Sequence, residues 1–177
     1  MAPELSGIIP PVVTPFTATG EIDERAFRGV IRFMVNNKVH GICVGGSSGE
    51  GHTFDTDEFR FLMEAAADEL KGAIPLLGGI IVNSTRLAIE RARAIEHLPV
   101  AGLQVTPAHY VFKPDDESTY KHFQALTAAT KFPVIIYNVV PWNYLSPALL
   151  VRIMKDMPGV LGVKQSAGDL KLTGDLM

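Results

Sequence analysis

Hydrophobic and polar positions divide the chain into two kinds of segment that alternate. Short runs are apolar at odd and even positions alike, which is typical of strands covered on both faces of a parallel sheet. The six runs cover residues 8–13, 41–45, 74–82, 103–106, 132–138 and 160–164. Between them, apolar residues recur at intervals of three and four, as on one face of a helix. These helical stripes begin at Phe27, Phe59, Ala88, Tyr120 and Leu149. The pattern predicts strands and helices in alternation.

Two of the expected helices carry start motifs. Asp55 precedes Glu58 by three residues, the spacing of a capping box, and Ser146 stands before Pro147, a cap followed by proline at the first helical position. One marker residue in each run gives successive intervals of 28 to 34 residues. A βαβ unit has about this length, so we expect an α/β protein with a parallel sheet.

Two architectures satisfy this pattern, an open doubly wound sheet and a (β/α)₈ barrel. The doubly wound fold often carries Gly-x-Gly-x-x-Gly after its first strand. The glycines of GGSSGEG (45–51) are spaced wrongly for that motif and for a phosphate-binding loop. A barrel has eight units and about 250 residues, whereas this sequence has six apolar runs. Composition leaves the choice open. No linker divides the chain, so we expect one domain over residues 1–177.

Composition narrows the classes of partner. The chain of 177 residues has a net charge of -3 and no cluster of Lys and Arg, which argues against binding to nucleic acid or to an anionic membrane surface. No apolar run approaches the roughly 20 residues of a membrane-spanning helix. The opening MAPELSGIIPPVV lacks the regions of a signal peptide, and the single Cys43 forms no intramolecular disulfide. We therefore expect a cytoplasmic protein.

Candidate chemistry lies at the carboxyl ends of the strands, where parallel α/β folds place their sites. Lys164 ends an apolar run. An amine among apolar groups is more readily neutral and then attacks carbonyls, although a lysine at a strand end also often reaches out to solvent. Tyr137 ends another run and either relays protons or only satisfies its hydroxyl. The small residues and hydroxyls of 45–50 suit a carboxylate or phosphate, or form an ordinary turn. The five histidines lack the spacing of a metal site, so no metal is expected.

Four of these segments, taken in order, carry a resemblance. They read GGSSGE (45–50), VTPAHY (105–110), VIIYNVVPW (134–142) and GVLGVKQSAGDL (159–170). Together they resemble the dihydrodipicolinate synthase and N-acetylneuraminate lyase family, and the rest of the chain is similar to it as well. The resemblance implies a class I Schiff-base aldolase of the (β/α)₈ TIM-barrel type. About the first six βα units of that barrel would be present.

The resemblance also implies a role for each matching residue. Lys164 would be the Schiff-base lysine, and Tyr137 the tyrosine that relays protons beside the imine. Ser47 and Ser48 would hold the carboxylate of pyruvate or another 2-keto acid. The family's synthases also carry a tyrosine after the fourth strand, often lent to a neighbouring subunit. Here His109 or Tyr110 stands at that place, and Tyr110 is taken as the candidate for substrate binding. The resemblance further implies no cofactor and a homo-oligomer, a dimer or tetramer.

Two departures from the family pattern limit these expectations. The synthases have an arginine two residues after the proline of Tyr-Asn-Val-Pro, whereas YNVVPWNY (137–144) has Asn143 there, so the second substrate stays open. Six strands leave two open sheet edges, so we expect a C-terminally truncated member of the family. The alternatives are a dehydratase or hydratase-aldolase acting on a sugar acid or an aromatic pyruvate, and a non-catalytic remnant that binds small molecules.

Overall fold

Parallel strands form one sheet in the computed structural model, which describes residues 5–177. Its five strands are β1 (Ile42–Val44), β2 (Leu76–Ile80), β3 (Gly102–Val105), β4 (Val134–Asn138) and β5 (Val160–Gln165). Each strand falls on one of the apolar runs, so five of the six predicted strands are confirmed. Residues 1–4, which open the segment used to argue against a signal peptide, lie outside the described residues.

Helices connect the strands at the predicted stripes. They are α1 (Glu24–Asn36), α2 (Thr56–Leu70), α3 (Thr85–Ala94), α4 (Asp116–Ala129), α5 (Pro147–Asp156) and α6 (Leu170–Gly174). Two 3-10 turns, η1 (Ser47–Gly49) and η2 (Pro141–Asn143), follow β1 and β4. The capping box of Asp55 and Glu58 and the cap of Ser146 before Pro147 are both confirmed. Within residues 5–177, no helix combines the length and the apolar character that crossing a membrane requires.

The run at 8–13 differs from the prediction, because it forms only an isolated parallel bridge between Pro11 and Cys43. Val12 N–H donates to Cys43 O at 2.8 Å, and Cys43 N–H donates to Pro10 O at 3.0 Å. The segment therefore lies where a first strand would lie. Its two prolines have no N–H to donate, so a continuous ladder cannot form.

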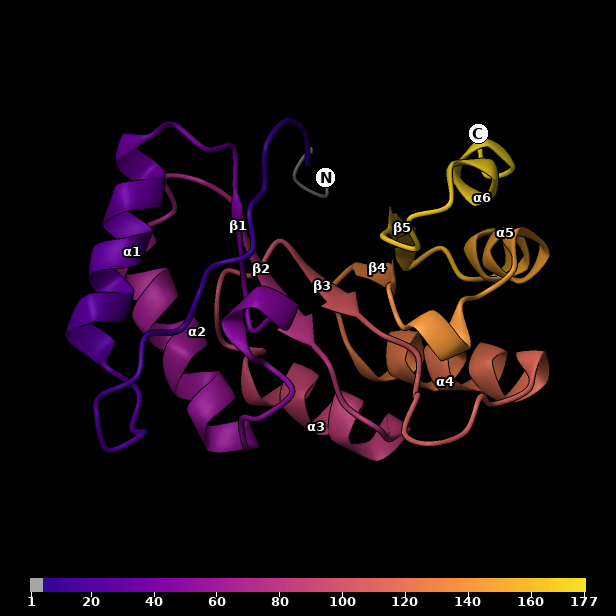
Figure 1. Cartoon of the computed structure of the whole chain (residues 1–177), viewed down its shortest axis with the longest axis horizontal. Helices are drawn as coiled ribbons and strands as arrows, with labels where there is room; N and C mark the ends of the chain where they lie inside the picture. The colour runs from indigo at the N-terminus through magenta and orange to yellow at the C-terminus, as the bar shows by residue number, and fades with distance from the viewer. Residues whose placement is uncertain (1–4) are drawn as a thin grey trace.

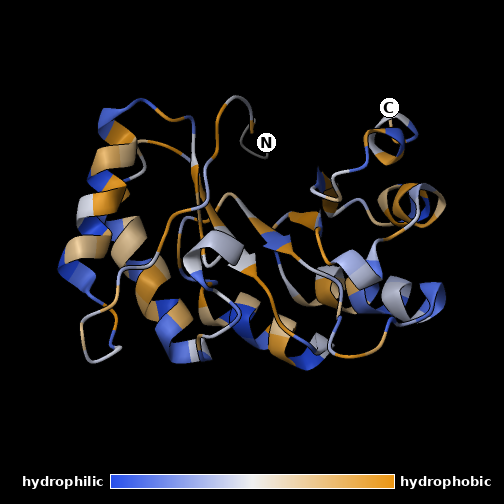
Figure 2. Ribbon diagram, in the orientation of Figure 1, coloured by the Kyte–Doolittle hydropathy of each residue, from blue (hydrophilic) through white to orange (hydrophobic). Residues whose placement is uncertain are grey.

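The strand order identifies the architecture. The strands pair in chain order, β1-β2-β3-β4-β5, with no reversal, whereas a doubly wound sheet reverses its order at a switch point. Figure 1 shows α1 to α5 arranged along one side of the curved sheet, from α1 at the left to α5 at the right. In Figure 2 the strands are mainly orange, and the helices are mixed in colour, as amphipathic helices are. The sheet thus curves as part of a barrel, with the helices outside.

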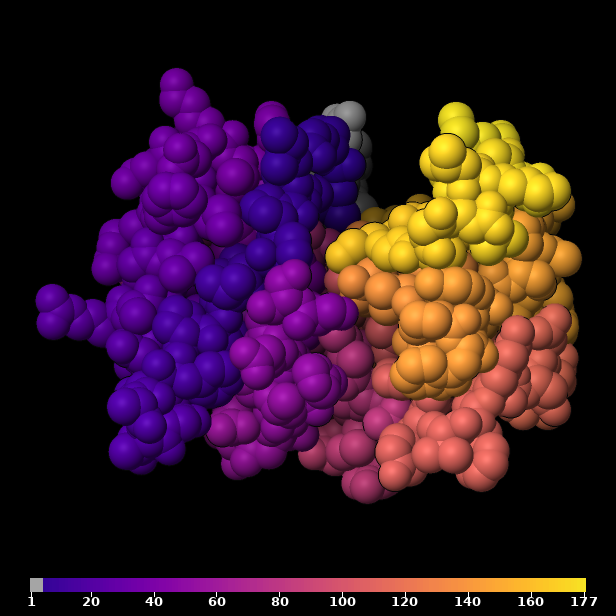
Figure 3. Space-filling view, in the orientation of Figure 1, coloured from indigo at the N-terminus to yellow at the C-terminus, as the bar shows by residue number. Residues whose placement is uncertain are grey.

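The hydrophobic core fixes which strand residues face the helices. Ile42, Val44, Leu103 and Val105 join the buried cluster that contains Phe59, Phe123 and Leu126 of the helices. Because side chains alternate along a strand, Cys43 and Gln104 face the other, inner side of the sheet. Figure 3 shows this inner side opening as a notch between the indigo N-terminal residues and the yellow C-terminal residues.

Candidate active site

Two of the predicted residues meet on the inner side of the sheet. Tyr137 of β4 and Lys164 of β5 are direct partners in the parallel ladder, and Lys164 Nζ lies 4.0 Å from the centre of the Tyr137 ring. Tyr137 is 6% exposed, and Lys164 is half-buried. A cation over an aromatic face is attracted by the ring quadrupole. The amine is thus held at the rim of the inner face and does not extend freely into solvent.

The turn after β1 brings a third predicted residue to this pair. Ser47 and Ser48 are exposed in η1, and Ser47 Oγ lies 3.4 Å from Tyr137 Oη, at the long limit of a hydrogen bond. Thr14 Oγ donates to Gly49 O at 2.9 Å from the other side of the turn. Lys164, Tyr137 and Ser47 therefore form a connected group that joins η1, β4 and β5.

Glycines allow this turn to fold against the sheet. Gly45 has a φ of +75°, and a Cβ there would lie 2.9 Å from Gly79 O. A Cβ at Gly79 of β2 would lie 2.6 Å from Gly46 N. Only residues without a Cβ permit such an approach of two backbones. The turn consequently sits directly on β2, with its two hydroxyls at the surface.

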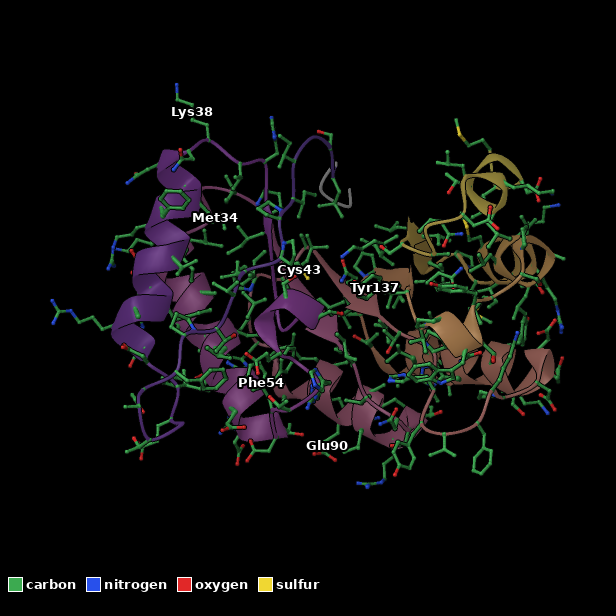
Figure 4. All side chains as sticks on the ribbon, viewed as in Figure 1. Met34, Lys38, Cys43, Phe54, Glu90 and Tyr137 are labelled. Atoms are coloured by element: carbon green, nitrogen blue, oxygen red, sulfur yellow. The ribbon has the colours of Figure 1, made fainter. Side chains whose placement is uncertain are left out.

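Two buried groups lie below the turn on the inner face. Cys43 is 2% exposed, and burial raises the pKa of its thiol to about 12, which the charge of Lys164 opposes only in part. Gln104 is 7% exposed and its Nε2 has no hydrogen-bond partner among the described residues. Both side chains approach within 3.9 Å of where a Cβ of Gly46 would be. In Figure 4, Cys43 and Tyr137 are labelled near the centre of the molecule. The floor of the site therefore combines a neutral thiol with a free amide donor.

Asn138, the residue after Tyr137, is a structural element of the site. It is fully buried; its Oδ1 accepts from Leu145 N at 2.9 Å, and its Nδ2 donates to Gln165 Oε1 at 3.1 Å. These bonds join the end of β4 to the loop before α5 and to the residue after Lys164. Asn138 thereby fixes the strand ends that carry the tyrosine and the lysine.

The loop after β3 holds the fifth candidate, Tyr110, outside this connected group. Tyr110 is 72% exposed, and among the described residues no hydrogen bond joins its hydroxyl to Tyr137 or Ser47. His109 is half-buried, and its backbone O accepts from Trp142 Nε1 at 2.8 Å. Asn143 is fully buried and its Nδ2 donates to Ala108 O at 2.9 Å. The loops after β3 and β4 are therefore bound to each other through η2.

A mainly apolar cavity lies elsewhere. It measures about 530 Å³ and lies between α5, β5 and α6, with Val163 and Gln165 in its lining. Both residues alternate with Lys164 along β5, so this cavity opens on the helix side of the sheet. It is separate from the group formed by Lys164, Tyr137 and Ser47.

Sequence comparison assigns the chain to a family. It matches the sequence model described as the Dihydrodipicolinate synthetase family over residues 4–177. The 4-hydroxy-tetrahydrodipicolinate synthase of Nitratidesulfovibrio vulgaris (strain DP4) is 33% identical over 177 residues, covering 98% of this chain and 60% of that protein. The enzyme of the same name from Bacillus subtilis (strain 168) is 33% identical over 163 residues, covering 90% and 56%. The chain thus spans about three fifths of the length of these relatives.

Solved structures give the same result. A putative dihydrodipicolinate synthetase from Pseudomonas aeruginosa has a TM-score of 0.92 and 28% identity, covering 98% of this chain and 60% of that one. A prophage protein of the dihydrodipicolinic acid synthase family from E. coli K12, solved with pyruvate, has a TM-score of 0.91 and 25% identity, covering 96% and 57%. CdNal from Clostridium difficile, solved with mannosamine, has a TM-score of 0.89 and 27% identity, covering 96% and 59%. The fold is of the (β/α)₈ TIM-barrel type with roughly six units present, and the chain belongs to the dihydrodipicolinate synthetase family.

Proposed function

We propose that this protein is a Schiff-base-forming lyase or aldolase that acts on pyruvate or another 2-keto acid. The observation that carries the proposal is the group at the strand ends, in which Lys164 Nζ lies 4.0 Å from the centre of the Tyr137 ring and the Tyr137 hydroxyl contacts Ser47. A nucleophilic amine, a phenol beside it and a hydroxyl turn are the groups that such a reaction requires. The family assignment supports the same chemistry.

The reaction begins at Lys164. In its neutral form the amine attacks the keto carbon of the substrate, and loss of water leaves an iminium ion. The iminium accepts the electron pair released when a proton or a carbon–carbon bond is lost, which gives an enamine. Tyr137 carries protons to and from these intermediates. We propose that the hydroxyls of Ser47 and Ser48, with the N–H groups of their turn, hold the carboxylate, and that no metal or organic cofactor takes part.

The test is trapping with borohydride in the presence of pyruvate, read by mass spectrometry of peptides. We expect a covalent adduct on Lys164 that requires both reagents. Lys164→Met is the variant that removes the amine, and Lys155→Met is the matched control on α5. An adduct that is absent, or that maps to another lysine, would contradict the mechanism.

The second substrate is proposed to present an apolar or aromatic part, as in a hydratase-aldolase acting on an aromatic pyruvate. Asn143 donates to Ala108 O and is fully buried, so it cannot serve an incoming carboxylate as the arginine of the resembling synthases would. Trp142 donates its N–H to His109 O and leaves 59% of its surface exposed. This ring is the surface available to the second substrate at the end of β4. Turnover of aldehydes with and without an aromatic ring tests this preference.

The remaining features are proposals of the same kind. We propose that residues 1–177 act as one domain, although residues 1–4 lie outside the described part. The protein would work in the cytoplasm as a homo-oligomer, with Tyr110 reaching toward substrate at a neighbouring subunit. Its high exposure, 72%, fits such a role. Sedimentation of wild type and of Tyr110→Ala, which should dissociate more readily, tests this proposal.

A further inference from the structure

Arg91 of α3 is a buried cation whose hydrogen bonds go to backbone carbonyls. Its side chain is only 4% exposed. One nitrogen donates to Gly51 O at 2.7 Å and another to Phe54 O. Burial lowers the pKa of its guanidinium, and the charges of nearby carboxylates oppose this only in part. Placing a guanidinium here is costly, whereas most buried helix positions are filled by apolar residues.

The two carbonyls belong to the segment that continues the serine turn. Gly51 N–H donates to Gly46 O at 3.2 Å, which closes the turn on itself. A Cβ at Gly51 would lie 1.8 Å from Gly45 O, so the backbones at the two ends of the turn are in contact. The hydrogen bond from Arg91 to Gly51 therefore fixes the C-terminal end of the turn.

Arg91 acts on the other end of the turn as well. Its guanidinium carbon lies 5.5 Å from the centre of the Phe59 ring. The same ring packs on Gly45, since a Cβ there would lie 3.0 Å from Phe59 Cε2. Figure 4 labels Phe54, in the segment after the turn, and Glu90 of α3. Thr56 Oγ donates to Glu90 Oε1 at 2.7 Å and adds a second tie between the two elements.

We propose that Arg91 is a positioning residue. It sets the distance between the Ser47–Ser48 turn and Tyr137 and thereby controls binding of the substrate carboxylate. The proposal rests on the proposed function. The contact from Ser47 Oγ to Tyr137 Oη is already at the long limit, at 3.4 Å, so a small displacement of the turn breaks it.

The test compares Arg91→Met, Arg91→Lys and Arg93→Met. Methionine keeps an unbranched apolar stem against Phe59 but donates no hydrogen bond, and lysine retains a cation that reaches one carbonyl. Arg93, exposed on the same helix, is the matched control. We measure the pyruvate concentration that gives half-maximal trapping of Lys164, the trapping rate at saturating pyruvate, and hydrogen exchange of the amides at 49–51.

We expect Arg91→Met to raise the half-maximal pyruvate concentration about tenfold. This is the effect of losing one hydrogen bond between the displaced turn and the substrate carboxylate. The trapping rate at saturation should stay within about threefold, because Lys164 is untouched, and exchange at 49–51 should quicken. Arg91→Lys should fall between this variant and wild type, and it serves alone if the methionine variant does not fold. Unchanged binding and exchange in a folded Arg91 variant would overturn the proposal. If wild type gives no adduct on Lys164, the proposed function fails, and the exchange rates alone then decide whether Arg91 positions the turn.

Discussion

Protonation of His122 should set part of the acid stability of the protein. This residue of α4 is 4% exposed, and its Nδ1 lies 2.9 Å from Thr85 Oγ. Burial lowers the pKa of His122 from 6.5 to about 4. Between these two values the unfolded chain binds a proton that the folded chain does not, so the free energy of unfolding falls as the pH falls. The two pKa values differ by about 2.5, and each unit corresponds to about 1.4 kcal/mol. The loss is therefore about 3 kcal/mol between pH 6.5 and 4, and this residue adds nothing further below that range.

Urea unfolding followed by circular dichroism from pH 7.5 to 4.5 measures this loss. His122→Asn removes the titrating group, and its amide oxygen can still accept from Thr85. The wild type should lose about 2 to 3 kcal/mol more than this variant over the range. His97→Asn, at an exposed histidine, is the matched control for the substitution itself. Parallel curves for wild type and His122→Asn would show that burial does not hold His122 neutral.

Three further substitutions test the site, and a fourth, Gly72→Ala, is the control for one of them. Tyr137→Phe keeps the ring beside Lys164 but removes the hydroxyl, so borohydride trapping should persist while exchange of the pyruvate methyl protons, followed by NMR, slows by about 10²- to 10⁴-fold; equal exchange would exclude the phenol as proton carrier. Gly45→Ala combines a φ of +75° with a close backbone contact and should cost about 2 to 4 kcal/mol of unfolding free energy. Gly72→Ala, at a φ of +77° with open space around it, should cost only about 1 to 2 kcal/mol. Trp142→Leu should lower turnover of aromatic second substrates relative to aliphatic ones and leave the trapping of pyruvate unchanged. A loss of trapping would instead show that Trp142 contacts the first substrate.

Hydrophobic patterns within single segments predicted most of the helices and strands. Apolar runs and helical stripes predicted the elements because each depends only on which faces of that element are covered. The exception is the run at 8–13, where the apolar pattern was right about position but the lost N–H groups of Pro10 and Pro11 reduce the strand to a bridge. The choice between barrel and open sheet depends on pairing between strands, which is a property of the assembled sheet and not of any single run.

The site was predicted where a residue stands at a strand end, and missed where its role depends on a distant partner. The sequence predicted that Lys164, Tyr137 and Ser47 are candidates because strand ends meet at one edge of a parallel sheet, and the structure brings the three together. Arg91 lies within a helical stripe and has no motif, and its proposed role depends on carbonyls about 40 residues earlier in the chain. Gln104 is the one polar residue between Leu103 and Val105 in an apolar run and belongs to no motif. Its neighbours Leu103 and Val105 are core residues, and successive side chains of a strand point to opposite faces. This alternation assigns Gln104 to the inner face.

The meeting of lysine and tyrosine depends on an irregularity that no motif encodes. Val134 pairs with Val160, but Ile135 pairs with Gly162, so Leu161 has no partner and β5 contains a bulge. If the pairing continued in regular register from Val134 and Val160, the partner of Tyr137 would be Val163, and Lys164 would face the helices, because a shift of one residue reverses every side chain. Bulges re-aim side chains next to active sites in this way. Leu161 is itself 44% exposed, so its own packing does not explain the bulge. The amine therefore lies over the phenol for two reasons. One is the identity of Lys164, and the other is that β5 has one residue more than its partner strand between Val160 and Lys164.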